Sequence, residues 1–307
     1  MLKHCQHSPC PRSQATIHRR AALRAIARET KAALAGILRQ LPRIEAHSSE
    51  KLTADDLPVL DPANCPGFAL SSDPKLRGTH VKVFSEDAFN AAISMAESLS
   101  ELATTQPEHN QRVVAINLAS DKKPGGVWLR GAMAQEEAFC YRSSLALSLH
   151  KSYYPWTIPT MGLHTRDVVI VRSSMSAGHA LLVPEPPATQ LPPVSISSVA
   201  AIRRPAVRKV FENGQYRQSI FKFPADRDLT KNKMRLALRI AARQKHELLV
   251  VGAMGCGAFR NPPKEITHCW SEVLGEIWFA VLDTRNEGNF EIFNHVKNFG
   301  KVDPWLK

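Results

Sequence analysis

One segment of the chain, GGVWLRGAMAQEEAFC, combines residue types that could do chemistry. Gly125 and Gly126 open it, and a glycine backbone can approach a ligand closely. Glu136 and Glu137 stand near its end, and carboxyl groups can coordinate, ionise or donate protons. The pattern indicates a ligand held between a glycine turn and a pair of acids.

The two acids fall near the start of a predicted helix that begins near Ala132 and runs through EEAFCYRSSLALSLH. Adjacent helical residues point about 100° apart. Glu136 and Glu137 therefore cannot flank one bond from opposite sides, as the two carboxyl groups of most glycosidases do. We expect one acid to hold the ligand and the other to act at the bond, with burial or a bound diphosphate raising the pKa of the proton donor. The alternative is an ordinary acidic first turn of a helix.

A second glycine-bearing loop, VVGAMGCGAFRNPP, also follows a short apolar strand. Ligands of open α/β sheets bind beyond the carboxyl ends of the strands, where both loops are expected. Gly252, Gly255 and Gly257 permit positive φ and can present successive N–H groups to a phosphate, and Phe259 can stack on a ribose or a base. Neither loop is a P-loop or a Rossmann fingerprint. The alternatives are structurally tight turns and a phenylalanine that plugs the loop.

The pattern of strands and helices predicts an α/β class with a largely parallel or mixed sheet. A basic amphipathic helix is predicted within residues 15–41, ended by Pro42, after a disordered tail over 1–15; residues 48–75 are predicted as loop. Further helices are expected over 85–103 with Ser85 as N-cap, over 230–246 with Thr230 as N-cap, and over 262–277. Strands are expected over 79–84, 112–119, 167–173, 194–200, 247–254 and 279–283. We expect one domain, 16–307, which includes an N-terminal helical extension over 16–75.

Composition limits the classes of protein that remain. Forty Lys and Arg against 28 Asp and Glu give a net charge of +12, which favours encounters with polyanions but also fits a merely basic soluble protein. The six cysteines form no CxxC pair or disulfide framework, and His4, Cys5, His7 and Cys10 lack a second ligand pair, so no metal is expected. No apolar stretch is long enough to span a membrane, and the N-terminus lacks the apolar core of a secretory signal. The basic helix either docks on the domain by its apolar stripe or serves targeting or a membrane surface.

The quoted residues resemble a known family. INLASDKKPGGVWLRGAMAQEEAFCYRSSL, then YYP, then VVGAMGCGAFRNPPKEI are similar to the microbial-type poly(ADP-ribose) glycohydrolase family, and RRAALRAIARET and THVKV resemble its N-terminal part. The resemblance implies a macrodomain-like α/β/α sandwich with a mixed central sheet. It also implies a hydrolase that cleaves ribose–ribose O-glycosidic bonds of ADP-ribose polymers, without a cofactor, and so reverses ADP-ribosylation, as in the DNA damage response. The implied partners are ADP-ribose, poly(ADP-ribose) and ADP-ribosylated proteins, with neither a membrane nor nucleic acid required.

The resemblance also assigns roles. Glu137 would donate a proton to the leaving oxygen, and Glu136 would hold a ribose hydroxyl. Gln135 would support the loop, and Phe259 would pack on the distal ribose. The implied ligand-binding residues are Asn117, Ser120, Gly125, Gly126, Val127, Gln135, Gly255, Cys256, Gly257, Ala258 and Phe259, of which the run from Gly255 to Ala258 would cradle the diphosphate.

Two positions depart from the family pattern. Val127 stands at the family's third glycine, and a β-branched residue dislikes positive φ and fills space, so it could narrow the site or weaken activity. Ser120 replaces a macrodomain asparagine, which could loosen the ribose contacts. The alternatives are an ADP-ribose-binding module without turnover and, from charge alone, a nucleic-acid-binding protein. We expect an intracellular protein, nuclear or cytoplasmic rather than mitochondrial.

Overall fold

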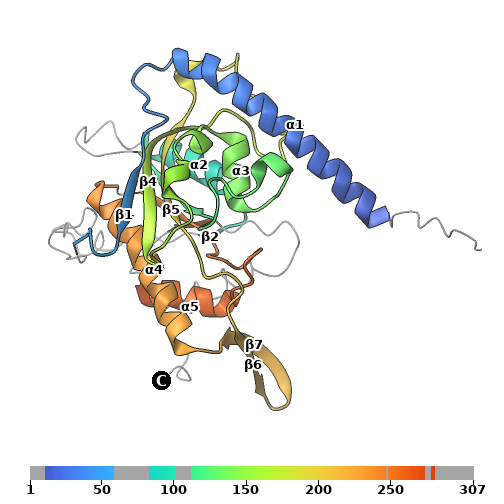
Figure 1. The fold of residues 1–307 in the computed structure, drawn as a ribbon, viewed down its shortest axis with the longest axis vertical. Helices are drawn as coiled ribbons and strands as arrows, with labels where there is room; N and C mark the ends of the chain where they lie inside the picture. The colour runs from blue at the N-terminus through green and yellow to red at the C-terminus, as the bar shows by residue number, and fades with distance from the viewer. Residues whose placement is uncertain (1–10, 59–82, 101–111, 247, 274–277, 281–307) are drawn as a thin grey trace, which may run out of the picture.

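A seven-stranded mixed sheet forms the centre of the protein (Figure 1). The computed structural model describes residues 11–58, 83–100, 112–246, 248–273 and 278–280. The sheet has the strand order β1-β4-β5-β3-β8-β9-β2, with bounds β1 Glu50–Thr53, β2 Val83–Phe84, β3 Val114–Leu118, β4 Met161–Val169, β5 Pro193–Val199, β8 Leu249–Val251 and β9 Trp278–Ala280. Since β3 runs parallel to both β5 and β8, the carboxyl ends of these three strands meet at one edge of the sheet. β4 is antiparallel to β5 and to β1.

Helices cover both faces of this sheet. The longer helices are α1 Pro11–Arg39, α2 Ala88–Ser100, α3 Gln135–Arg142, α4 Pro224–Arg243 and α5 Pro263–Val273, and the short 3-10 helices are η3 Trp128–Arg130, η4 Leu145–Leu147, η5 Lys151–Tyr153 and η6 Ala188–Gln190. Successive strand residues face opposite sides of a sheet. Ala115 of β3 accordingly packs in a core cluster with α2 and α3, whereas Ile116 packs with α4 and α5. The predicted α/β/α sandwich is confirmed.

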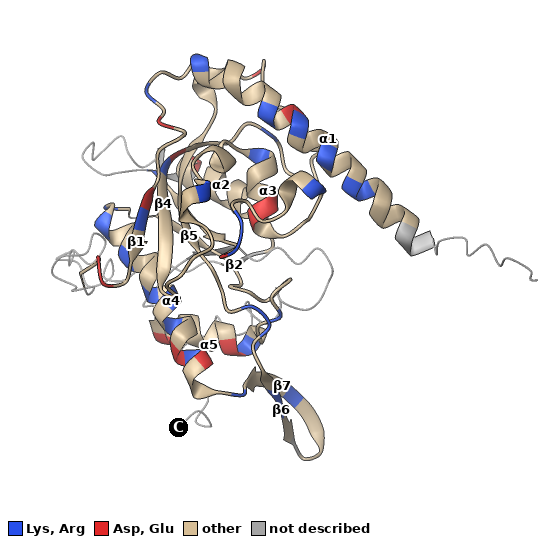
Figure 2. Cartoon of the chain, viewed as in Figure 1, with Lys and Arg blue, Asp and Glu red and all other residues tan. Residues whose placement is uncertain are grey.

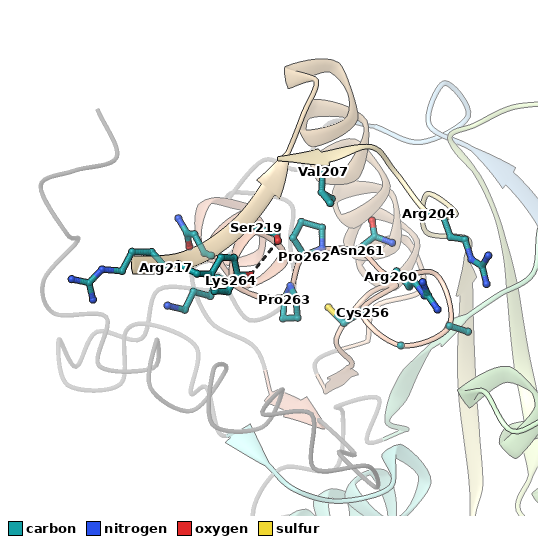
Figure 3. Close-up of a pocket in the computed structure, with 14 residues that line it drawn as sticks. Arg204, Val207, Arg217, Ser219, Cys256, Arg260, Asn261, Pro262, Pro263 and Lys264 are labelled. Carbon is teal, nitrogen blue, oxygen red and sulfur yellow. Dashed lines mark hydrogen bonds between the residues drawn. The ribbon is translucent and has the colours of Figure 1, made fainter. Parts of the chain in front are cut away.

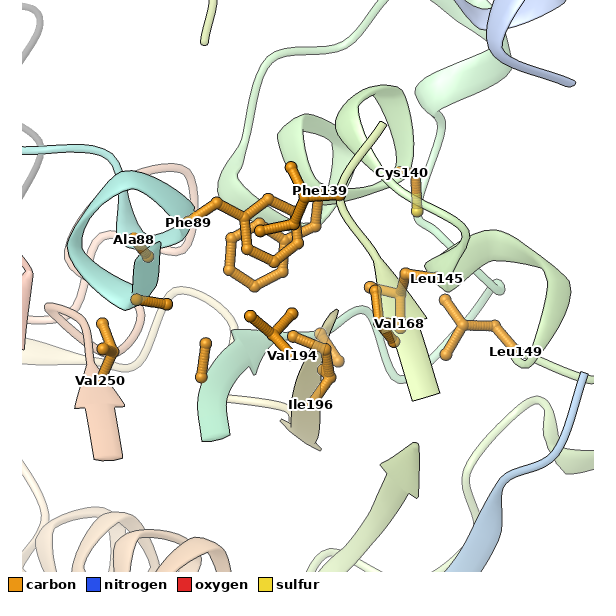
Figure 4. Packing of buried hydrophobic residues seen from close by; sticks show 14 of the residues in the cluster. Ala88, Phe89, Phe139, Cys140, Leu145, Leu149, Val168, Val194, Ile196 and Val250 are labelled. Carbon is orange, nitrogen blue, oxygen red and sulfur yellow. The ribbon is translucent and has the colours of Figure 1, made fainter. Parts of the chain in front are cut away.

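The contact between α2 and α3 fixes the helix that carries the two acids. The rings of Phe89 and Phe139 are stacked, with centroids 4.0 Å apart and planes 11° apart (Figure 4). The buried guanidinium of Arg142 pairs with Asp87, whose carboxylate also caps α2 by accepting the N–H of Phe89 at 2.9 Å. An N-cap carboxylate satisfies an orphan N–H of the helix start. One side chain therefore both begins α2 and anchors α3.

The N-terminal helix α1 docks on the domain through its apolar stripe. Leu23, Ala27, Leu34 and Ile37 are buried, as a docked amphipathic helix requires. The hydroxyl of Thr30 donates to the carbonyl of Tyr141 in α3 at 2.8 Å. The Lys and Arg residues of α1 whose positions Figure 2 colours blue are exposed. No helix in the described ranges is long and apolar enough to cross a membrane.

Several predicted boundaries need correction. Residues 11–15, predicted as part of a disordered tail, belong to α1, whereas 1–10 lie outside the described residues. Within the predicted loop 48–75, residues 50–53 form β1, because this segment pairs with β4. The predicted helix from Ala132 to His150 is shorter: α3 ends at Arg142, and 3-10 turns follow it.

Other differences concern caps and strands. Asp87 rather than Ser85 caps α2, and Thr230 lies inside α4, where its hydroxyl donates to the carbonyl of Asp226 at 2.8 Å. The strand predicted over 167–173 begins earlier, at Met161. The hairpin of β6 Val207–Glu212 and β7 Gln215–Phe221 was not predicted. Of the strand predicted over 79–84, the described part forms β2. Of the strand predicted over 279–283, the described part lies in β9.

We predict that Phe139→Ala destabilises the fold by about 3–5 kcal/mol, because it removes a buried ring and leaves a cavity against Phe89. Denaturant unfolding followed by circular dichroism measures this change. Phe223→Ala is the matched control, since that ring is half exposed, and its effect should stay below about 1 kcal/mol. Equal losses in the two variants would contradict the prediction.

Candidate active site

Gln135 ties the first turn of α3 to the carboxyl end of β3. Its side-chain oxygen accepts the N–H of Leu118 at 2.7 Å, and its amide nitrogen donates to the carbonyl of Ile116 at 2.9 Å. The pairing of β3 with β8 reaches only to Ala115, so these two backbone groups lie just beyond it. The amide therefore takes the place of the missing strand, because buried backbone groups must find partners.

Glu136 is the more deeply buried of the two acids, with 2% of its surface exposed. One carboxyl oxygen accepts the N–H of Ser120 at 2.8 Å. The other oxygen, Oε1, is buried without a hydrogen-bond partner among the described residues. Burial raises the pKa of Glu136 to about 8, and the neighbouring Glu137 adds to this, whereas the Ser120 N–H, the Asn117 side chain and the Gly125 N–H lower it. A buried polar atom without a partner is costly, which points to a ligand group that hydrogen-bonds to it.

Glu137 has a different environment, with 7% of its surface exposed. Its Oε1 accepts the N–H of Val127 at 3.0 Å, and its Oε2 accepts the N–H of Ala134, the residue before α3, at 3.0 Å. The carboxyl group is thus clamped between the glycine turn and the start of its own helix. The two acids thus differ in their burial and in their contacts.

The glycine turn leaves no room for side chains. A Cβ on Gly126, which has φ +59°, would collide with the carboxyl group of Glu137. A Cβ on Gly125, with φ +65°, would lie 2.9 Å from the sulfur of Cys140. Both positions also lie in the left-handed region, which favours glycine. The backbone of this turn can touch the acids only because both residues are glycine.

Val127 does not need to be glycine. Its φ is −125°, outside the left-handed region, and its side chain is 40% exposed. Its N–H makes the contact with Glu137, and every residue except proline has this group. The positive-φ penalty expected for valine at this position therefore does not apply.

Asn117 and Ser120 lie on either side of the end of β3. Asn117 is fully buried, donates to the hydroxyl of Ser198 at 3.0 Å, and has a side-chain oxygen without a partner among the described residues. The hydroxyl of Ser120 accepts the N–H groups of Lys122 and Lys123 at 3.2 and 3.3 Å. The backbone N–H of Ser120 thus binds Glu136, whereas its hydroxyl stabilises the turn that follows it.

The second glycine loop follows β8, the strand beside β3. Gly255 has φ +74°, and a Cβ there would collide with the side chain of Asn261, whose amide donates to the carbonyls of Ile202 and Gly255. Cys256 is buried, Gly257 and Ala258 are exposed, and Phe259 is half-buried. Within the described part of the chain, no hydrogen bond links this loop to the glycine turn or the acids. Strand order alone brings the two loops to one edge.

Two tyrosines that the sequence analysis did not assign also belong to this region. The hydroxyl of Tyr141 lies 2.7 Å from the carbonyl of Trp128 and 2.9 Å from that of Ala132, so it holds the segment between the glycines and α3. Burial raises the pKa of Tyr154 well above its usual range, and the charge of Glu136 adds to this. Its buried hydroxyl has no partner among the described residues. Both residues lie in segments that carry the resemblance, but no spacing rule marks them.

Comparisons with known proteins relate part of this chain to a known family. Residues 43–171 match the family model described as "Microbial-type PARG, catalytic domain". This segment is similar to the catalytic domain of the microbial-type PARG family. The predicted family is thereby confirmed, and with it the predicted enzyme class, a glycosidase of the poly(ADP-ribose) glycohydrolase type. No curated protein matches the chain.

Solved PARG structures share the fold. Poly(ADP-ribose) glycohydrolase from Thermomonospora curvata, bound to the inhibitor ADP-HPD, is 22% identical, with a TM-score of 0.63 over 90% of this chain and 99% of that one. The enzyme from Deinococcus radiodurans in complex with ADP-ribose is 27% identical, with a TM-score of 0.54 over 72% of this chain and 85% of that one. The predicted macrodomain-like fold is confirmed.

We predict that Glu136 makes the PARG domain less stable as the pH rises from about 4.5 to about 8. Because its folded-state pKa is raised, the folded chain holds a proton in this window that the unfolded chain has released, so rising pH favours unfolding. Urea unfolding near both ends of the window measures the slope, which Glu136→Gln should flatten. Glu45→Gln, at an exposed acid, is the control and should leave the slope intact. A slope that is the same in wild type and Glu136→Gln would contradict the raised pKa.

Proposed function

We propose that the protein hydrolyses ribose–ribose O-glycosidic bonds of ADP-ribose polymers and that Glu136 and Glu137 divide the work. One observation carries this proposal: two adjacent acids face a glycine turn at the end of β3, and one of them keeps a buried, unpartnered oxygen. The family match and the ADP-ribose bound in the Deinococcus radiodurans structure support the choice of substrate.

Glu136 is the residue that holds the substrate. A ribose hydroxyl can both donate and accept, so it can satisfy the free Oε1 of Glu136. Asn117 has its own unpartnered side-chain oxygen at the end of β3 and offers a second acceptor. The site should therefore prefer ligands with ribose hydroxyl groups. A ligand without them would leave these buried oxygens unpaired, and its binding would be weaker by the cost of desolvation.

Glu137 is the residue that acts at the bond. The N–H groups of Val127 and Ala134 fix the direction of its carboxyl group, and each carboxyl oxygen keeps a further position that can carry the proton donated to a substrate oxygen. In the proposed reaction the protonated carboxyl gives its proton to the leaving ribose oxygen as the anomeric C–O bond breaks. Water then attacks the anomeric carbon and returns a proton to Glu137, and the bound diphosphate assists the incoming water. The acid is regenerated, as general acid–base catalysis requires.

The second glycine loop forms the side of the proposed site opposite the two acids. Gly257 and Ala258 are exposed in the loop after β8, the strand next to β3, and we assign to the run from Gly255 to Ala258 the contacts with the diphosphate. Backbone N–H groups near positive-φ residues make concave sites for phosphate. Phe259, at the end of this run, packs on the distal ribose in the proposed complex.

We predict that Glu137→Gln lowers the release of ADP-ribose from poly(ADP-ribose) by about 100- to 10,000-fold, because it removes the proton donor but keeps the shape. Binding of ADP-ribose, measured by calorimetry, should be retained. Glu45→Gln, at an exposed position, is the matched control. Undiminished release by Glu137→Gln would overturn the assignment of Glu137. No release by the wild type from any linkage would leave the alternative, an ADP-ribose-binding module.

A second prediction separates the enzyme from a module inactivated by valine. Because Val127 acts through its N–H and its side chain faces solvent, Val127→Gly should change turnover by less than about threefold, or under ~0.7 kcal/mol in the barrier. Steady-state release of ADP-ribose measures it. Gly126→Ala is the contrasting variant and should abolish turnover, since its Cβ collides with Glu137. A large gain on Val127→Gly would show that the valine side chain restricts the site.

A further inference from the structure

A cavity of about 570 Å³ lies between the β6–β7 hairpin, the loop after β8 and the start of α5 (Figure 3). Its lining contains no residue of the segment 117–137, which carries the two acids, and no Asp or Glu. Four cationic residues line it: Arg204, Arg217, Arg260 and Lys264. Ligand pockets of drug-sized molecules span about 300–1,000 Å³. The volume and charge therefore suit an anion of nucleotide size.

The cations reach the cavity from separate elements. Arg204 follows β5, Arg260 lies in the loop after β8, and Lys264 lies in the first turn of α5. None of these three side chains pairs with a carboxylate in the described part of the chain. A cation at a helix N-terminus is unfavourable, because that end of the helix carries partial positive charge. A bound anion would offset the repulsion at Lys264, because Glu265, the acid of the same helix turn, pairs with Arg227 instead.

An aromatic ring stands beside these charges. Tyr216 of β7 lines the cavity and is 55% exposed, and its hydroxyl lies 3.1 Å from that of Ser219, which also lines the cavity. Exposed aromatic rings in basic grooves stack on nucleic-acid bases. Ring and cations together match the base and the phosphates of an adenine nucleotide.

We propose that this cavity binds a second ADP-ribose unit, the neighbour of the unit held at Glu136 and Glu137, so that the enzyme grips the polymer at two places. The proposal rests on the proposed function. Its basis is that Cys256, Gly257 and Ala258, assigned above to the diphosphate of the first unit, also form a wall of the cavity. One loop thus stands between two consecutive units of the polymer. Each unit carries a diphosphate, which supplies the anions that the cavity lacks.

The test compares ADP-ribose with a purified ADP-ribose oligomer of defined length, both bound to full-length protein carrying Glu137→Gln to prevent hydrolysis. Linked binding at two places predicts that the oligomer binds at least about tenfold more tightly than ADP-ribose. Adding Arg204→Gln and Lys264→Gln should remove most of this advantage and leave the affinity for ADP-ribose as it was. The matched control adds Arg28→Gln and Lys31→Gln, which remove the same charge from exposed positions on α1. It should keep the advantage.

Three results would overturn the proposal. Equal affinity for monomer and oligomer would show that no second unit is held. An equal loss of both affinities in the Arg204 and Lys264 variant would place the first unit's own diphosphate in the cavity. Displacement of the oligomer by single-stranded RNA as readily as by ADP-ribose polymer would make the cavity a general polyanion site. The binding comparison involves no turnover, so its failure is distinct from that of the proposed glycohydrolase activity.

Discussion

The hydrogen bonds that fasten the first turn of α3 to the end of β3 are the constraint on which the site depends. Three successive side chains make them: Gln135 to the backbone of β3, Glu136 to Ser120, and Glu137 to Val127. The first two bonds use backbone N–H groups at the end of β3 and just beyond it, and the third uses an N–H of the glycine turn. Side-chain oxygens in the first turn of α3 thus accept backbone N–H groups from the segment that follows β3. The same hydrogen bonds that satisfy this backbone therefore position the two acids.

Packing against the neighbouring helices α1 and α2 holds α3 in the position that these hydrogen bonds require. Phe89 stacks on Phe139 from α2, and α1 contacts the carbonyl of Tyr141 through Thr30. A Cβ on Gly131 would collide with the backbone of Arg20, so α1 also lies directly against the segment between the glycines and the acids. The N-terminal helix is therefore part of the support of the candidate site. Preorganised groups held by packed elements position a substrate more accurately than mobile loops do.

Most positive charges of the described residues lie on the surface of the protein, whereas the two acids of the candidate site are buried. The chain as a whole carries a net charge of +12, and Figure 2 shows Lys and Arg positions spread over α1 and α4. The acids of α3 are buried within this positive surface, where the raised pKa of Glu136 keeps it protonated at neutral pH. A polymer of phosphates is attracted by the surface and is not repelled by that acid.

The sequence by itself determined the fold class, and it predicted which residues form the candidate site. Apolar strands followed by glycine loops predicted a sheet with ligand loops at one edge, and the adjacency of Glu136 and Glu137 predicted unequal roles, since both are local properties of the chain. Tertiary structure decided what depends on distant partners. The strand β1 forms because it pairs with β4. The β6–β7 hairpin, which forms one wall of the basic cavity, was likewise found only in the structure. The backbone angle of Val127 and the unpartnered oxygen of Glu136 likewise follow from packing, because a sequence lists neighbours along the chain and burial depends on neighbours in space.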